Sequence, residues 1–201
     1  NTSQHDGIHS FHVGKNAKVV YIERHYGEGD GNGENVMNPT TGIEIDDGGY
    51  LEMETTQIKG IDSTERVTNA KLANDAKLVI REKIMTHGKQ FAKTDFTVEL
   101  NGENSSANVI SRSVAKGNSK QTYRSNIVGN ARCTGHSECD AILADHGIVS
   151  ASPELTAANE DASLIHEAAI GKIAGEQILK LRTLGLTEEE AEQKIIEGFL
   201  K

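Results

Sequence analysis

The stretch KLVIREKI, residues 77–84, alternates apolar and polar side chains over the length of one β-strand. Six further stretches have the same character and are bounded by Gly, Asn, Asp or Ser: 17–24, 41–47, 50–58, 95–100, 108–114 and 140–145. Many of their spacings are near ten residues, and no long helical pattern separates them. This arrangement is typical of a β-sandwich or a β-solenoid.

The composition favours the solenoid over the sandwich. Aromatic residues make up only 4% of the chain, whereas a single thick core takes much of its buried area from large rings. Twenty glycines and short apolar segments indicate a thin, repetitive architecture instead. The motif has no strict period, and the one hairpin-type turn is Asn101-Gly102.

The last thirty residues change character and predict two helices. Ile178, Leu181 and Leu184 have helical spacing. Gly185 then stands where a left-handed glycine ends a helix, with Leu186 placed to contact Leu181. We therefore expect the first of the two helices to stop at Gly185.

The second predicted helix begins with a capping box. Thr187 is the expected N-cap and Glu190 its partner, and the acidic first turn suits the helix N-terminus. One apolar face follows, made of Ala191, Ile195, Ile196 and Phe199. This face is either a docking surface for a partner protein or packs on the end of the β-structure.

Length, charge and cysteine usage limit the function. A chain of 201 residues suits one domain with a small appendage, and a net charge of -9 argues against a nucleic-acid partner. Two cysteines and no long apolar run favour a cytoplasmic protein without a membrane segment. The first residue is Asn and the opening NTSQHDGIHSFHV reads as the inside of a domain, so we expect residues to be missing upstream.

Three segments carry possible chemistry. The glycine-rich YGEGDGNGEN, residues 26–35, lacks the GK[ST] ending of a P-loop and is expected to be a mobile loop. IHEAAIG, residues 165–171, starts like a zincin helix but has Ile170 where the second metal-binding histidine belongs, which excludes a zincin. CTGHSEC, residues 133–139, leaves a metal site, a disulfide and two buried thiols open, although a reducing compartment disfavours the disulfide.

The segments ECDAILAD (138–145) and IHEAAIGKIAGEQILKLRTLGLTEEEAEQKIIEGF (165–199) closely resemble the C-terminal part of SufB/SufD-type proteins, the scaffold components of Suf iron-sulfur cluster assembly. VVYIERHYGEG, residues 19–29, resembles a mid-domain strand of the same family. The resemblance implies an all-β, right-handed parallel β-helix over residues 1–172 and a C-terminal helical hairpin over 173–201. It further implies a non-catalytic scaffold that holds transient iron-sulfur clusters, with a SufC-type ATPase docking near the C-terminal helices.

The resemblance also assigns residues. The family's QCDS motif corresponds to Glu138-Cys139-Asp140-Ala141, and the His-Glu pair of the SufB branch to His166 and Glu167. Because SufD-like members lack that cysteine and glutamate, this chain looks SufB-like. Its shortness and the Gly171-Lys172 pair indicate a compact variant, which is expected to form a homodimer or to pair with a SufD-like partner. Cys133 and His136 have no counterpart in the motif, so we keep them only as auxiliary metal-ligand candidates.

The chemistry of Cys139, His166 and Glu167 suits this assignment, since a thiolate, an imidazole and a carboxylate hold a cluster weakly enough to pass it on. Neighbouring strand residues point to opposite faces, so His166 and Glu167 both face Cys139 only if a bulge intervenes. One chain falls short of four ligands, which favours a site completed across a dimer interface. Two alternatives remain: a structural β-helix subunit without a cluster, and a β-helix carbohydrate-active enzyme with paired carboxylates.

Overall fold

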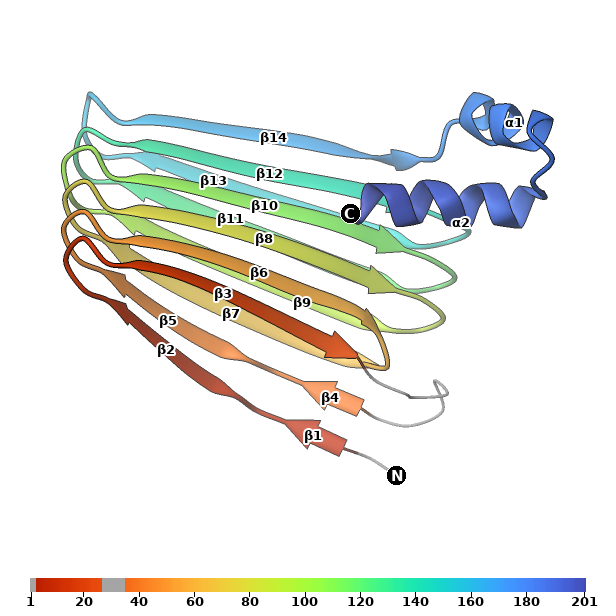
Figure 1. The fold of residues 1–201 in the computed structure, drawn as a ribbon, viewed down its shortest axis with the longest axis horizontal. Coiled ribbons are helices and arrows are strands. Elements are labelled where there is room, and N and C mark those ends of the chain that lie inside the picture. The colour runs from red at the N-terminus through yellow and green to blue at the C-terminus, as the bar shows by residue number, and fades with distance from the viewer. Residues whose placement is uncertain (1–2, 27–34) are drawn as a thin grey trace.

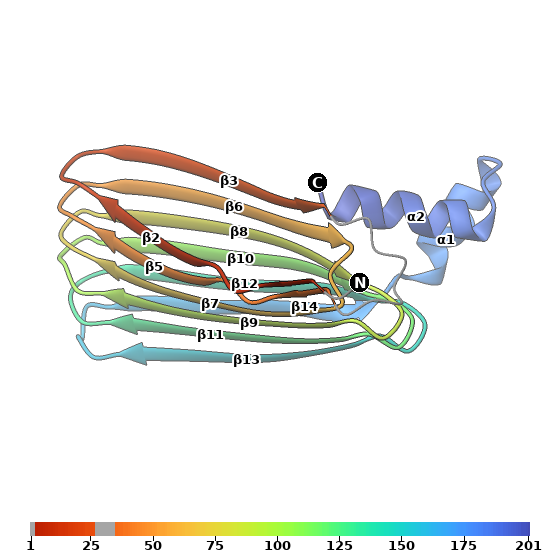
Figure 2. The same ribbon diagram turned by 90° about the horizontal axis from the view of Figure 1, so that it is seen from below.

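A computed structural model describes residues 3–26 and 35–201. Two parallel β-sheets face each other and the chain passes from one to the other in successive coils, so the predicted parallel β-helix is confirmed (Figures 1 and 2). The coils stack from the N-terminal strands to the C-terminal ones, and two helices lie at one end of the strands. Residues 27–34 of the predicted glycine-rich loop lie outside the described residues.

The strands alternate between the sheets along most of the chain. Sheet A contains β1 (Ser3–His5), β2 (Ile8–Val13), β4 (Asn35–Met37), β5 (Thr40–Ile45), β7 (Ser63–Leu72), β9 (Phe91–Leu100), β11 (Lys120–Gly129) and β13 (Ile148–Ala157). Sheet B contains β3 (Lys18–Tyr26), β6 (Tyr50–Lys59), β8 (Lys77–Thr86), β10 (Ser106–Ala115), β12 (Thr134–Leu143) and β14 (Ser163–Lys172). The helices are α1 (Gly175–Thr183) and α2 (Glu188–Phe199).

The register of sheet B gives the length of a coil. Tyr50 pairs with Lys77, Lys77 with Ser106, Ser106 with Thr134 and Thr134 with Ser163, which are steps of 27, 29, 28 and 29 residues. The variation of one or two residues is absorbed in the turns, because the paired strands themselves keep register. A coil of nearly constant length without an identical motif explains why the sequence shows no strict period.

The turns use residues that tolerate a left-handed backbone. A positive φ occurs at Asn16, Asp75, Asn104 and Asp145, and at glycines such as Gly117, each in a turn between strands. Asn, Asp and Gly pay the smallest steric cost in this conformation. The Gly, Asn and Asp residues that bounded the predicted strands therefore mark the corners of the coils.

Inward side chains of the middle coils form one continuous apolar core, which includes Leu51, Leu78, Ile80, Phe96 and Leu100. Alternate positions along each strand are buried and partly exposed, as expected for strands with one face inside and one outside. The core also contains buried Ser, Thr, Gln, Arg and Glu side chains, so it is more polar than the sequence pattern indicated.

The C-terminal helices end and begin where the sequence predicted. Gly185 has φ +96°, and its N–H and that of Leu186 donate to the carbonyls of Arg182 and Leu181, which is a Schellman motif. Thr187 and Glu190 form the reciprocal capping box at the start of α2. Both helix boundaries are thus encoded by local sequence.

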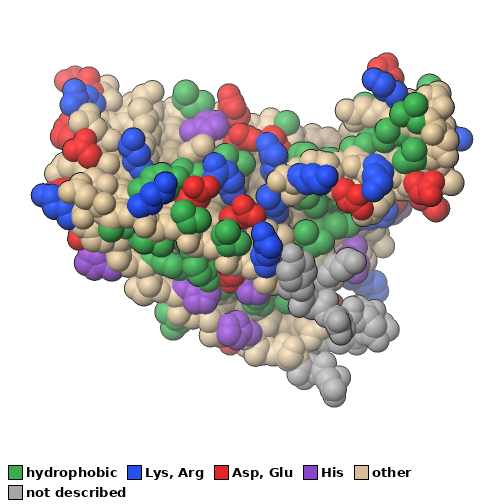
Figure 3. Space-filling view, in the orientation of Figure 1, with side chains coloured by type: hydrophobic (Ala, Val, Ile, Leu, Met, Phe, Trp, Pro, Cys, Tyr) green, Lys and Arg blue, Asp and Glu red, His purple; other side chains and the backbone are tan. Residues whose placement is uncertain are grey.

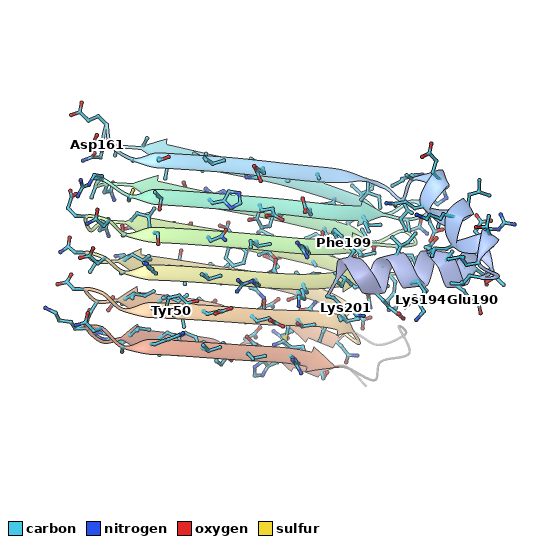
Figure 4. All side chains as sticks on the ribbon, turned by 45° about the horizontal axis from the view of Figure 1, so that its top comes forward. Tyr50, Asp161, Glu190, Lys194, Phe199 and Lys201 are labelled. Atoms are coloured by element: carbon cyan, nitrogen blue, oxygen red, sulfur yellow. The ribbon has the colours of Figure 1, made fainter. Side chains whose placement is uncertain are left out.

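The apolar face of α2 packs on the outer face of sheet B. Ile196 is 2% exposed and contacts a cluster that contains Val114 and Met85, and Lys116 forms an ion pair with Glu192. Figure 4 shows α2 lying over the ends of the strands, with Phe199 and Lys201 at its last turn. Of the two alternatives for this face, packing on the solenoid holds for Ile196 and Phe199, while Ile195 and Phe199 remain part-exposed. In the described part of the chain, no helix has the length and apolar character needed to cross a membrane.

Candidate cluster and metal site

Cys139 lies in the middle of β12 and points into the solenoid. The sequence pattern placed it at the start of a strand, whereas β12 begins five residues earlier, at Thr134. Its register neighbours are Ser111 on β10 and Ala168 on β14. The side chain is 1% exposed. Because Ala168 belongs to the last coil and has a small side chain, only one thin layer separates the thiol from the end of the solenoid.

Burial controls the acidity of this thiol. Removal from water, together with the nearby Glu82 and Asp140 carboxylates, raises the pKa of Cys139 to about 12. The thiol is therefore protonated at neutral pH. A metal ion that binds here has to displace the proton, which makes binding tighter at higher pH.

His166 lies on the same inner face, on β14. Its register partner is Ser137, so it is diagonal to Cys139 rather than directly beside it. Diagonal neighbours in a sheet are about 7–8 Å apart at Cα, which is within reach of an imidazole ligand to a shared group. Both ring nitrogens are buried and make no hydrogen bond of good geometry, and burial lowers the pKa of His166 although the nearby Ser137 backbone opposes this shift. The imidazole is therefore uncharged at neutral pH, and its free nitrogen lone pair can act as a metal ligand.

Glu167 points the other way. It is the next residue after His166 in a regular strand and pairs with Glu138, on the outer face of sheet B. No register shift occurs between β12 and β14, so the bulge that would turn Glu167 inward is absent from this pair. The structure brings Cys139 and His166 to one face and leaves Glu167 on the opposite one.

His136 also faces outward, close to Glu167. Its Nε2 lies 3.4 Å from Glu167 Oε2, and its Nδ1 lies 2.9 Å from Asn108 Oδ1. One potential ligand atom of each of His136, Glu138 and Glu167 lies within 4.8 Å of the others. Sequence reasoning missed Glu138, although its spacing of two residues from His136 on a strand was a signal that both share a face.

Cys133 and Cys139 are both buried free thiols. The extended chain between them spans about 20 Å at 3.3 Å per residue, far beyond the 7 Å that a disulfide bridges. The disulfide that the sequence left open is excluded, because the residues between the two cysteines form β12 instead of a turn. Cys133 and Cys139 both belong to the apolar core, and what separates them is the position of Cys139 one coil from the end of the solenoid, beside Ala168 and diagonal to His166.

Comparison with known proteins decides the family. A family model described as SUF system FeS cluster assembly, SufBD core domain, matches residues 1–199. The chain belongs to the SufBD family. An iron-sulfur cluster assembly SufBD family protein of Methanocaldococcus jannaschii is 34% identical over 94% of this chain and 60% of the relative. Relatives of the same description from Archaeoglobus fulgidus and Methanothermobacter thermautotrophicus are 34% and 33% identical over 98% of this chain.

This SufBD chain spans 60%, 53% and 48% of the length of those three relatives. The match runs through the whole solenoid as well as the helices, so it covers Cys139, His166 and Glu167. The resemblance identified from the C-terminal segments is therefore confirmed at the level of the family.

The SufBD solenoid also contains a buried charged cluster that the sequence analysis did not single out. Arg66 on β7 lies 3.7 Å from the Glu82 carboxylate and 3.6 Å from that of Glu23. Thr94 and Ser111 each donate to Glu82 at 3.1 Å. Burial raises the pKa of Glu82 in spite of these partners. The sequence did contain a sign of this cluster, because Glu82 in KLVIREKI stands two residues from the apolar Ile80 and Ile84 and therefore on the same inward face.

Proposed function

We propose that this chain is a non-catalytic scaffold that holds nascent iron-sulfur clusters at the C-terminal end of its solenoid. The observation that carries the proposal is the inner face of the last two coils. There Cys139 supplies a thiol, and His166 supplies an imidazole whose two buried nitrogens have no partner. Membership of the SufBD family supports the assignment to cluster assembly rather than to a carbohydrate-active enzyme, and the presence of Cys139 with His166 favours a cluster-holding subunit over a purely structural one.

The cluster is the cargo of this site. A thiolate and an imidazole are two ligands, whereas a [2Fe–2S] or [4Fe–4S] cluster is held by four protein ligands in total. Glu167 points outward from the same strand, so within one chain it does not join Cys139 and His166. We propose that a second chain, either a second copy or a SufD-like partner, supplies the remaining ligands at the last coil.

The edges of the sheets support this arrangement. β13 and β14 are the last strands of sheets A and B, and neither has a neighbour on its outer side among the described residues. An unpaired edge is a template for pairing with another chain. Docking of a second copy along β14 brings its ligands beside His166 without any change in the fold.

The test of the cluster site is anaerobic reconstitution of Cys139→Ala and Cys133→Ala with iron and sulfide. We expect the Cys139 variant to lose most of its bound iron and sulfide and the Cys133 variant to keep most of both. Absorption and Mössbauer spectra identify the bound species. Equal retention by the two variants would contradict the scaffold proposal, because both thiols would then be structural.

We further propose that a SufC-type ATPase binds the C-terminal helices, and that both proteins work in the cytoplasm. Since the solenoid covers most of the apolar face of α2, the docking residues are sought on α1 and at its C-cap, where Leu179 and Leu184 are 61% and 72% exposed. Leu179→Asp with Leu184→Asp should abolish binding of the ATPase in a pull-down while reconstitution of the cluster is retained. Undiminished binding would place the ATPase elsewhere.

A further inference from the structure

The outer face of sheet B carries a group of potential metal ligands that is separate from the inner thiol. His136 and Glu138 are two residues apart on β12 and therefore point to the same side, and Glu167 of β14 lies directly beside Glu138. The three ligand atoms lie within 4.8 Å of one another. Figure 3 shows histidine and acidic side chains together on this face of the solenoid.

We propose that His136, Glu138 and Glu167 form a binding site for one divalent first-row transition-metal ion on the outside of the solenoid. The site requires neither Cys139 nor a cluster, so it goes beyond the proposed scaffold function. Two carboxylates neutralise the charge of a divalent ion, and the imidazole adds an affinity for transition metals over Mg²⁺ and Ca²⁺.

The distances suit such an ion. Ligand atoms about 2.1 Å from a tetrahedral ion are about 3.4 Å apart. His136 Nε2 and Glu167 Oε2 are already 3.4 Å apart. The remaining adjustment falls on Glu138, whose flexible side chain closes a gap of an ångström or so by rotating about its own bonds.

A neighbouring amide prepares the histidine for this role. Asn108 Oδ1 is an acceptor, so Nδ1 of His136 donates its proton there, at 2.9 Å. This contact leaves the lone pair of Nε2 directed toward the two carboxylates. Metal-binding histidines commonly donate their second nitrogen to such a partner, which fixes both the tautomer and the orientation of the ring.

The site is open to solvent on one side. The side chains of His136 and Glu167 are 32% and 68% exposed. An ion held by three protein ligands from one strand pair keeps at least one further coordination position. That position is free for water or for a ligand from another molecule, which distinguishes the site from a closed structural zinc site.

An ordinary ion pair between His136 and Glu167 is the alternative explanation of the same contact. It needs no third group, so it predicts no dependence on Glu138. A divalent ion requires all three side chains. Substitution of Glu138 therefore distinguishes a metal site from an ion pair.

The test is a titration of the metal-free chain with Zn²⁺, and anaerobically with Fe²⁺, by calorimetry and by equilibrium dialysis with metal analysis. Glu138→Gln and His136→Gln are each expected to lose one equivalent of metal, or to bind it at least tenfold more weakly. Neither substitution changes the core, because both side chains face outward. Asn108→Ala is expected to weaken binding about 10- to 100-fold through loss of the histidine's partner.

Two controls separate this site from others. Glu54 stands in the same outward column of sheet B, in register with Arg81, then Ile110 and then Glu138. Glu54→Gln should leave the metal stoichiometry unchanged. Cys139→Ala should also retain the ion, which separates this site from the cluster site whatever the fate of the scaffold proposal.

X-ray absorption of zinc-loaded Cys139→Ala, which lacks the thiol of the proposed cluster site, gives an independent readout. We expect a first shell of nitrogen and oxygen atoms at about 2.0–2.2 Å and no sulfur at about 2.3 Å. Wild-type stoichiometry and affinity in both Glu138→Gln and His136→Gln would overturn the proposal. A zinc-sulfur shell, or loss of the same ion in Cys139→Ala, would overturn it as well.

Discussion

The middle coils and the last coil follow the same strand pattern but have different interiors. Ile84 on β8 and Ile170 on β14 stand in one column of sheet B, linked in register through Ser113 and Ala141. Ile84 is 4% exposed and Ile170 is 40% exposed. An inward side chain is thus buried by the coils on both sides of it, and β14 has a neighbour on only one side in the described structure.

The two regions also differ in how their inward polar side chains are paired. In the middle coils, the buried Glu82 is enclosed and paired with Arg66, Thr94 and Ser111, although the inward Thr55 and Gln57 each keep an oxygen without a partner. In the last coil, the inward His166 keeps both nitrogens without a partner. Enclosed pairs such as Glu82 with Arg66 contribute stability to the middle coils, and the unpaired imidazole at the end of the solenoid supports the proposal that clusters bind there.

The largest expected effect comes from opening the buried charge cluster. Arg66→Leu leaves the fully buried Glu82 without its cation, and we expect a loss of about 3–5 kcal/mol in the free energy of unfolding at pH 7. Urea denaturation measures this loss. Burial raises the folded-state pKa of Glu82 above its usual value, so its contribution is complete at low pH and falls as pH rises. The variant should therefore be less destabilised near pH 5 than at pH 7.

Arg124→Leu is the matched control on sheet A. Arg124 faces outward and forms ion pairs with Asp95 and Glu154. Since exposed ion pairs contribute little to stability, the loss should be far smaller than that of Arg66→Leu. Equal losses of unfolding free energy for Arg66→Leu and Arg124→Leu would contradict the comparison, because they would mean that the charges inside the middle coils are as well solvated as those on the surface.

The second prediction tests the column of isoleucines directly. Ile84→Ala should reduce the free energy of unfolding by about 2–5 kcal/mol, because it leaves a cavity in a packed coil. Ile170→Ala removes a side chain that is already part-exposed, so its loss should be about 1 kcal/mol or less. Denaturation of the two variants under identical conditions gives the difference. A larger loss for Ile170→Ala would show that the last coil is covered in solution by another chain.

The smallest effect concerns Cys139, which lies one coil from the end. Its folded pKa of about 12 is above the unfolded value of 9.0, so the folded state loses stability as pH rises above 9. At pH 10 this loss is about 1.4 kcal/mol. Between pH 8 and pH 10 the metal-free wild type should therefore lose about that much more stability than Cys139→Ala. Parallel pH profiles would mean that water already reaches the thiol.

The sequence predicted seven of the strands but missed others for a definable reason. The predicted stretches fall in β3, β5, β6, β8, β9, β10 and β12. β7 and β11 were not predicted, because their inward positions include Thr64, Arg66, Gln121 and Ser125. With polar residues on the buried face, the two-residue apolar alternation that signals a strand is absent.

The candidate site was predicted in its residues but not in its arrangement. The family motif identified Cys139, His166 and Glu167, and alternation along a strand already implied that His166 and Glu167 diverge. The 27 residues between Cys139 and His166 would set the two side by side in a coil of that length, whereas the register sets Ala168 beside Cys139 and makes His166 diagonal. Glu138 was quoted as part of the motif, and its proximity to His136 and Glu167 emerged only from the pairing of β12 with β14.

The amino-acid sequence by itself determined the local features of this SufBD chain: strand segments, turn residues, the Schellman end of α1 and the capping box of α2. Each depends on residues within one turn or one strand, so nearby sequence is enough. The tertiary structure decided the register of the coils, the packing of α2 on sheet B and the exposure of the last coil. These features depend on which distant strands lie side by side, and a shift of one residue in that pairing moves every side chain to the opposite face.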